Sequence, residues 1–200
     1  MPQLRILIID TGPLITLAVA ESLDYLFLPG MPVIIPDAIL YEATSKTSAL
    51  GADEIVGWTQ ANALRLQVIG TQVFAAHLDR LGVGLTGLPD LGERAALEVA
   101  RNTPYLADGE QALLLTEDDR SIRGNFIALD DEERVVPMTT YDFLEGLEQA
   151  QLINSVDAVY ERASDAVRLA SKRRLAKERH DTAMAALQSV LATQAKRTTP

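Results

Sequence analysis

The chain has 200 residues, a net charge of −10 and 48% hydrophobic residues, so it can bury the core of one domain and carry an extension. The absence of cysteine excludes disulfides, thiolate metal sites and cysteine nucleophiles. The first apolar run has only four residues before a carboxylate, too few for a signal peptide or a membrane span. We therefore expect a cytoplasmic protein with no membrane partner.

The charge is unevenly distributed along the chain. Residues 160–200 hold 9 Lys and Arg against 4 Asp and Glu, a net charge of +5, whereas residues 1–159 carry −15. An acidic body does not attract nucleic acid through its overall field, because affinity for phosphate comes mainly from Lys and Arg. Any nucleic-acid partner must therefore be held by local charges, by metal ions or by the C-terminal tail.

The first predicted element is a strand over 6–9, and Asp10 follows it directly. An unbroken run of branched residues is typical of a strand buried on both faces of a parallel sheet. Thr11 is predicted to cap a helix over about 14–26, with Pro13 in a first helical position. Asp10 then lies at the carboxyl end of a central strand, where open α/β sheets form their ligand sites.

An isolated aspartate at this place would be a turn or capping residue. The tripeptide Asp10-Thr11-Gly12 also matches the catalytic triplet of aspartic proteases, whose chemistry needs two such carboxylates from a second copy or a symmetric dimer. This chain has no second copy of the triplet, and its pattern is not all-β. Asp10 becomes a functional candidate only if other carboxylates reach the same edge of the sheet.

A second buried strand is predicted over 33–35, followed by a helix that Pro36 and Asp37 open. Glu42 lies at the border of the apolar face of that helix, where an ordinary solvated glutamate is the alternative interpretation. The next predicted segments are a helix over 52–63, a strand over 64–69, a helix over 71–81 and a glycine-rich loop over 82–89.

A further helix is predicted over 94–101. Asp90 and Glu93 precede it with the spacing of a capping box, in which Asp90 is the cap and Glu93 returns to the cap's backbone. Taken alone, Glu93 is therefore a cap partner rather than a catalytic group.

A third buried strand over 113–116 ends in Glu117, Asp118 and Asp119. Three adjacent like charges repel one another, so an ordinary loop gains little from placing them together. A short strand over 134–137 and a helix over 139–147 follow. The alternation of strands and helices predicts an α/β fold with a central parallel sheet and crossover helices.

The pattern changes after about residue 153, so we predict a domain over 1–152 and a helical, basic extension over 153–200. Apolar residues recur there at helical spacing, before a basic cluster over 172–179. This helix either covers the acidic body of its own chain or extends to a second subunit or to an RNA backbone. Of these, we expect packing within a homodimer, with the basic cluster exposed near the substrate path. The apolar residues that would form its packed face are Val156, Val159, Ala163, Val167 and Ala170.

Three of the acids named so far, Asp10, Glu93 and Asp118, fall at strand ends or helix starts on one edge of the predicted sheet, and Glu42 can reach that edge from its helix. Four converging carboxylates require protonation or a cation. Oxygen ligands select Mg²⁺ or Mn²⁺. Such an ion can coordinate a phosphate oxygen and lower the pKa of a bound water, which is the chemistry of metal-dependent phosphodiester cleavage.

These residues resemble the ordered acidic motifs of PIN-domain proteins, above all the prokaryotic VapC-type toxins and their relatives with a Gly-Glu third motif. The resemblance covers about residues 4–150 and implies a three-layer α/β/α sandwich around a parallel sheet. It also implies an Mg²⁺- or Mn²⁺-dependent ribonuclease that acts on RNA, forms dimers and is blocked by an antitoxin protein. The motifs that carry it are Asp10–Ile15, Glu42, Gly92-Glu93 and Leu115–Asp119.

The resemblance also assigns roles to particular residues. The catalytic acids it implies are Asp10, Glu42, Glu93 and Asp118. The metal ligands it implies are Asp10, Glu93, Asp118 and Asp119. The hydroxyls of Thr11 and Thr116 are expected to steady these carboxylates.

Two other classes of protein are alternatives to a ribonuclease. One is a catalytically silent PIN-like module that binds nucleic acid or regulates a partner, whose acids only order the domain. The other is a phospho-accepting receiver or a Rossmann-type phosphohydrolase. A receiver normally has its acidic pair after the first strand and a lysine at a late strand end. Here the pair is late and Lys46 is the only lysine before residue 172, which disfavours that class.

Overall fold

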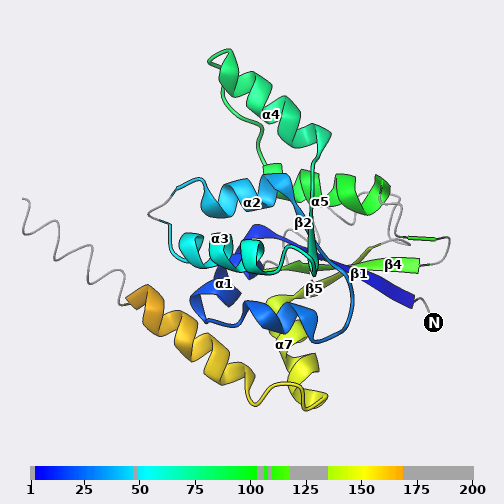
Figure 1. The fold of residues 1–200 in the computed structure, drawn as a ribbon, viewed down its shortest axis with the longest axis vertical. Coiled ribbons are helices and arrows are strands. Elements are labelled where there is room, and N and C mark those ends of the chain that lie inside the picture. Colours follow the sequence, from blue (N-terminus) through cyan, green and yellow to red (C-terminus); the bar gives the residue numbers. More distant parts are fainter. Residues whose placement is uncertain (1–2, 47–48, 103–105, 108–109, 118–134, 169–200) are drawn as a thin grey trace, which may run out of the picture. The chain divides into compact units, whose positions relative to one another are not determined.

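A computed structural model describes residues 3–46, 49–102, 106–107, 110–117 and 135–168. Its centre is a five-stranded sheet in the order β3-β2-β1-β4-β5, in which every neighbouring pair is parallel (Figure 1). The strands are β1 (Gln3–Ile9), β2 (Val33–Pro36), β3 (Leu66–Ile69), β4 (Glu110–Thr116) and β5 (Val135–Thr139). The predicted parallel sheet is confirmed.

Helices flank this sheet, which gives the predicted three-layer α/β/α sandwich (Figure 1). Helix α5 packs against β1 and β2, while α7 packs against β4 and β5. The helices are α1 (Thr11–Val19), the 3-10 helix η1 (Leu23–Phe27), α2 (Asp37–Thr44), α3 (Ala52–Ala61), α4 (Gln72–Gly82), α5 (Leu91–Asn102) and α7 (Thr140–Gln149). A further helix covers 156–168.

The core is centred on β1. Its side chains from Ile6 to Ile9 are at most 1% exposed, because β2 and β4 pair with both edges of the strand and helices cover both faces. Full burial of one such side chain contributes about 1.5–3 kcal/mol. The same reasoning explains the apolar runs of β2 and β4, since a parallel strand buried on both faces has no solvent side for polar residues.

The helix predicted over 14–26 is divided in the structure. Helix α1 ends at Val19, and Glu21 then adopts a left-handed backbone with φ of 53°. The Ser22 hydroxyl donates to the Ala20 carbonyl at 2.9 Å, and η1 follows. Apolar periodicity could not reveal the break, because the apolar residues on both sides of it are buried.

The last described helix begins beside the core of its own chain. Ile153, Val156 and Val159 are buried members of that core, and the Val156 N–H donates to the Glu148 carboxylate at 3.1 Å. The prediction that this face packs within a homodimer is therefore wrong for Val156 and Val159. Both side chains pack on the core of their own chain, because the chain turns directly after α7.

Arg162 ties the same helix to the end of α1. Its guanidinium donates to the Ala20 carbonyl at 2.9 Å and to the Ser22 hydroxyl at 3.0 Å. The contacts divide the chain into one unit over Met1–Ala163 and a second over Ser164–Pro200. In the described part of the second unit, Arg168 pairs with Asp165 at 2.9 Å. Ala170 and the basic cluster over 172–179 lie outside the described residues.

Within the described ranges, no helix combines the length and the apolar character needed to cross a membrane.

Candidate functional site

The candidate site lies where the connections of the sheet diverge. Strands β1 and β4 are neighbours, but the chain continues from β1 towards β2 and from β4 towards β5. Parallel sheets open a crevice at the carboxyl ends of two such strands. Asp10 follows β1 and Thr116 ends β4, so both lie at this place, as the sequence predicts.

Asp10 is fixed by its backbone and by its side chain. Its N–H donates to the Leu115 carbonyl of β4 at 2.9 Å, and its Oδ1 accepts from the Thr11 N–H at 2.7 Å. Asp10 is thus the N-cap of α1, and the prediction that Thr11 is the cap is wrong. The Thr116 hydroxyl lies 3.5 Å from Asp10 Oδ2. One side-chain oxygen therefore orders the helix start, while the other faces β4.

Glu42 reaches the same edge from α2. The Thr11 hydroxyl donates to Glu42 Oε2 at 3.0 Å, so the hydroxyl expected to steady a site carboxylate does so. A methyl group added at Gly92 would lie 2.7 Å from Glu42 Oε2 and 3.3 Å from the Thr11 hydroxyl oxygen. The absence of a side chain at Gly92 therefore allows α5 to begin directly beside the Glu42 carboxylate.

Glu93 follows Gly92 in the first turn of α5 and completes a group of three acids. The pKa of Asp10 is raised to about 6, first by burial and then by the negative charges of Glu93 and Glu42. Hydrogen bonds from the Thr11 N–H and from Thr116 act in the opposite direction. The structure therefore places the carboxylates of Asp10, Glu42 and Glu93 within electrostatic range of one another.

The alternative interpretation of Glu93 as part of a capping box depends on Asp90. Asp90 has a left-handed backbone with φ of 50°, whereas the N-cap of a helix is normally extended. The Asp90 carbonyl nevertheless accepts from the Arg94 N–H at 3.0 Å, so Asp90 stands at the N-cap position with an unusual backbone conformation. The interpretation of Glu93 as a cap partner therefore stays an alternative to its role as a site acid.

The fourth predicted acid, Asp118, and the additional ligand, Asp119, lie outside the described residues. The last described residue before them is Glu117, whose carboxylate accepts from the Thr140 hydroxyl at 3.1 Å. A methyl group at Gly12 would overlap Glu117 Cγ. Glu117 is therefore packed over the start of α1 and joined to the start of α7.

Two glycines of the site were not identified from the sequence as steric requirements. Gly12 accommodates Glu117, and Gly92 accommodates Glu42. In the sequence, Gly92 stands out only as the residue before Glu93. The need for a residue without a side chain depends on a neighbour 105 residues away in the chain for Gly12 and 50 residues away for Gly92, and no local sequence pattern reveals that neighbour.

The donor chemistry of the site suits a hard divalent cation. Asp10, Glu42 and Glu93 offer only carboxylate oxygens, which are preferred ligands of Mg²⁺ and Mn²⁺. Bound positive charge would also relieve the repulsion that raises the pKa of Asp10. Within the described residues, no three acidic or histidine side chains lie close enough together to hold a metal ion.

The fold and the site together define a class, the parallel α/β proteins with an acidic site at the point where the strand order reverses. Residues 6–124 match the model of a family described as a PIN domain, and this range contains all five predicted site acids. The match covers more than half of the chain, so the protein belongs to the PIN-domain family. PIN domains are generally nucleases, and the chain therefore has a nuclease fold. The comparison with curated proteins gives no match.

Proposed function

We propose that this protein is a metal-dependent endoribonuclease that hydrolyses RNA phosphodiester bonds. The observation that carries the proposal is the convergence of Asp10, Glu42 and Glu93 from three elements of a PIN fold. In this proposal Asp10, Glu93, Asp118 and Asp119 hold Mg²⁺ or Mn²⁺. The catalytic acids are Asp10, Glu42, Glu93 and Asp118.

Electrostatics supports a catalytic rather than a purely structural use of these acids. Burial and two neighbouring carboxylates oppose ionisation of Asp10, so the arrangement lowers the stability of the free protein near neutral pH. Perturbed carboxylates in a crevice are typical of functional sites. A divalent cation bound here supplies positive charge for a phosphate oxygen and for activation of a water molecule.

The surrounding residues of the chain hold the acids in place for that chemistry. The Thr11 N–H fixes one oxygen of Asp10, and the Thr11 hydroxyl fixes one oxygen of Glu42. Thr11 therefore sets the separation of these two acids, because both of its polar groups are engaged. Such supporting contacts orient ligands and are needed for full activity in metal sites.

The finer assignments rest on the motifs shared with VapC-type proteins. We propose that the protein acts in the cytoplasm as the toxin of a toxin–antitoxin pair, as a homodimer, and that an antitoxin protein blocks its site. We also propose that residues 1–152 form the nuclease domain and that 153–200 form an extension with its own role. Val156 and Val159 anchor the start of that extension to the domain core.

A second candidate function is a catalytically silent PIN-like module that binds nucleic acid or regulates a partner. The described ligands do not by themselves form a group of three that could hold an ion, and the other two proposed ligands, Asp118 and Asp119, lie outside the described residues. A silent module has no need for affinity towards cations. Calorimetric titration of the full chain with Mn²⁺, compared with the Asp10→Asn variant, separates the two functions.

The direct test uses the purified full chain with single-stranded and structured RNAs of mixed sequence. We expect internal cleavage with Mn²⁺ or Mg²⁺ and none with excess EDTA. Cleavage that continues in EDTA would exclude a metal-dependent mechanism. A chain that cleaves no RNA and binds no Mn²⁺ would be the silent module.

A further inference from the structure

Two tyrosine rings lie in contact at the carboxyl end of β5. Strands β4 and β5 end level with each other, because Thr116 pairs with Thr139 in the parallel ladder. Helix α7 begins with the next residue, so Tyr141 stands in its first turn. The ring centroids of Tyr141 and Tyr160 lie 5.8 Å apart, and Tyr160 belongs to the helix over 156–168. Two helices thus supply one aromatic surface, the tyrosine pair, at the edge of the sheet that carries the candidate site.

Glu117 connects the tyrosine pair to the candidate site through contacts on both of its sides. A methyl group at Gly12 would overlap Glu117 Cγ, so this side chain covers the start of α1 just after Asp10. Its carboxylate accepts from the Thr140 hydroxyl at 3.1 Å. Burial raises the pKa of Tyr160 to about 12, and the negative charge of Glu117 adds to the rise, so this carboxylate lies within electrostatic range of the Tyr160 hydroxyl. The tyrosine pair therefore adjoins the candidate site in space, with one side chain between them.

The two rings differ in exposure. Tyr160 is half-buried and packs against the hydrophobic core. Tyr141 is 49% exposed, so its ring is open to solvent while Tyr160 holds it from the side. A ring that is already held loses little freedom when a flat ligand stacks on it. The tyrosine pair is thus a preformed stacking surface.

The charges around the tyrosine pair favour a nucleobase over a phosphate. Glu117 and Asp142 both act on the Tyr160 hydroxyl through their negative charge. Carboxylates repel phosphate, but they accept hydrogen bonds from the N–H groups on the edges of bases. A base can therefore stack here while its phosphate lies towards the proposed metal ligands, where a bound cation attracts it.

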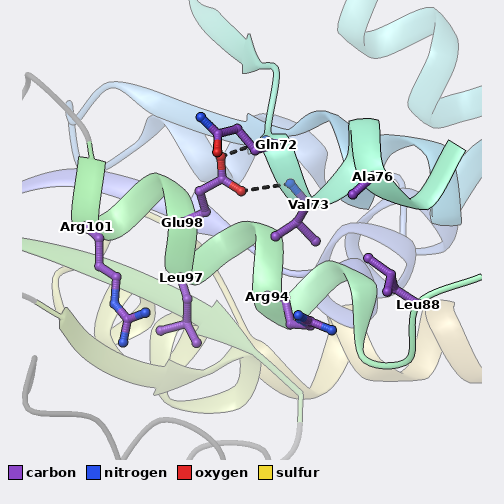
Figure 2. Close-up of a pocket in the computed structure, with 8 residues that line it drawn as sticks. All are labelled: Gln72, Val73, Ala76, Leu88, Arg94, Leu97, Glu98 and Arg101. Atoms are coloured by element: carbon purple, nitrogen blue, oxygen red, sulfur yellow. Dashed lines mark hydrogen bonds between the residues drawn. The ribbon is translucent and has the colours of Figure 1, made fainter. Parts of the chain in front are cut away.

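The cavity between α4 and α5, of about 570 Å³, offers no comparable surface (Figure 2). Its lining side chains are aliphatic, amide or charged, and none of these described residues is aromatic. The one acid among them, Glu98, accepts from the Gln72 N–H at 2.7 Å and from the Val73 N–H at 3.0 Å (Figure 2). Glu98 thus attaches the start of α4 to α5, and the cavity has no ring on which a base can stack.

We propose that Tyr141 stacks on a nucleobase of the RNA strand whose phosphate is held at the candidate site. Tyr160 is the positioning residue that holds the Tyr141 ring. The inference rests on the proposed function for the identity of the ligand as RNA. Every base has a π-face, so stacking tolerates all four bases, and the tyrosine pair orients the strand rather than selecting a sequence.

The test detects stacking with 2-aminopurine, a base whose fluorescence is quenched when it stacks on a ring. Single-stranded 12-mer RNAs carry this base at successive positions. Each RNA is titrated in Mn²⁺ with the full chain carrying Asp10→Asn, so that binding is measured without cleavage. Tyr141→Ala, Tyr141→Phe and Tyr141→Trp are added singly to this background. Leu152→Ala is the matched control, because Leu152 is 48% exposed and lies just beyond the other end of α7.

We expect the background protein to quench the fluorescence at one or two neighbouring positions of the RNA. Tyr141→Ala should abolish this quenching and weaken binding about 10-fold, as is typical when one base loses its aromatic partner. Tyr141→Phe and Tyr141→Trp should keep both the quenching and the affinity, because a ring remains. Leu152→Ala should behave like the background protein. Circular dichroism and thermal melting check that all variants are folded.

Three results would overturn the inference. In the first, Tyr141→Ala binds and quenches like Leu152→Ala. In the second, Tyr141→Phe loses as much affinity as Tyr141→Ala, which assigns the contact to the hydroxyl and not to the ring. In the third, the background protein binds none of the RNAs. Loss of the proposed nuclease function is a separate result, because it is measured as cleavage by the parent chain. A parent that stacks a base on Tyr141 but does not cleave would retain this inference for a silent module.

Discussion

The two ends of the β1–β4 pair differ in how their charged side chains are compensated. At the amino end, Arg5 pairs with Glu110 at 2.6 Å. The pKa of Glu110 is lowered there by the Ala107 N–H and by Arg5. At the carboxyl end of the same two strands, the pKa of Asp10 is raised to about 6 by burial and by two further acids.

This difference shows that the sheet itself does not require acids to gather at the carboxyl ends of its strands. The same two parallel strands carry a matched ion pair at one end, where the register shifts between Leu4 and Ile6, and a group of acids at the other. Packing therefore does not force the acids together. Their convergence reduces the stability of the free protein, and this favours a role in holding a ligand.

The largest expected effect comes from removing one charge at the carboxyl end. Asp10→Asn keeps the shape and the cap of α1 but loses a proposed metal ligand. We expect RNA cleavage in Mn²⁺ to fall at least about 100-fold. Glu110→Gln makes the same chemical change at the amino end and should cleave like the parent. Equal rates for Asp10→Asn and the parent would remove these acids from the mechanism.

A smaller loss of RNA cleavage is expected when the carboxyl end of β1 and β4 is crowded by a methyl group without a change of charge. Gly92→Ala places a methyl group 2.7 Å from Glu42 Oε2, so the carboxylate must move. We expect cleavage to fall about 10-fold, as is typical when a contact that supports a metal site is disturbed. The chain should remain folded, which thermal melting can check.

Gly146→Ala is the matched control for this change. Nothing lies within 4 Å of a methyl group at Gly146, which is inside α7. Alanine there should stabilise the helix by about 0.5–1 kcal/mol and leave cleavage unchanged. If both alanine variants cleave at the parent rate, the close approach of Gly92 and Glu42 has no role in activity.

Much of the fold could be predicted from local patterns. The apolar runs of β1, β2 and β4 identified buried parallel strands, because such strands are covered on both faces. Asp10 could be placed at the site for the same reason, since a carboxylate that ends a central strand has only one edge to occupy. Glu42 had no strong motif around it, and its position follows from the Thr11 hydroxyl, which is 31 residues away in the sequence.

The features that the sequence did not reveal depend on three-dimensional neighbours. The break after α1 depends on a left-handed residue, Glu21, whose type gives no warning of that conformation. The burial of Val156 in its own core depends on where α7 ends. An apolar helix face shows that a partner surface exists but does not say which surface it is. The predicted homodimer contact of Val156 and Val159 was wrong because the apolar pattern could not identify the partner surface.

The metal-free protein should become less stable as the pH rises through the titration of Asp10. Below pH 3.8 the carboxyl is protonated in both states, and up to about pH 6 only the unfolded state ionises it. The free energy of unfolding should therefore decrease by no more than about 3 kcal/mol over this window. Asp10→Asn should lack this decrease, so its stability relative to the parent should grow with pH.

Urea unfolding in EDTA at pH 4, 5, 6 and 7 measures that difference, because other titrating groups are common to both proteins. Saturating Mn²⁺ should stabilise the parent more than Asp10→Asn, since binding to the native state adds to its stability. A difference that stays constant with pH would show that the carboxyl of Asp10 is not opposed by its surroundings. The contrast between the two strand ends would then be lost.

The smallest expected effect on the pH dependence of stability comes from the ion pair at the amino end of the strands, and it has the opposite sign to that of Asp10. The pKa of Glu110 is lowered from 4.5, so its stabilising contribution is present above pH 4.5 and is lost as the pH falls further. Glu110→Gln should therefore reduce the pH dependence of stability on the acid side, measured by urea unfolding between pH 3 and 6. The change should be smaller than that of Asp10→Asn, because solvent screens an exposed ion pair. The effect of Glu110→Gln on stability should also weaken in 0.5 M KCl, whereas the effect at the half-buried Asp10 should persist. If Glu110→Gln instead increased in stability with pH relative to the parent, both strand ends would carry unfavourable charge, and the acids at the carboxyl end would no longer be exceptional.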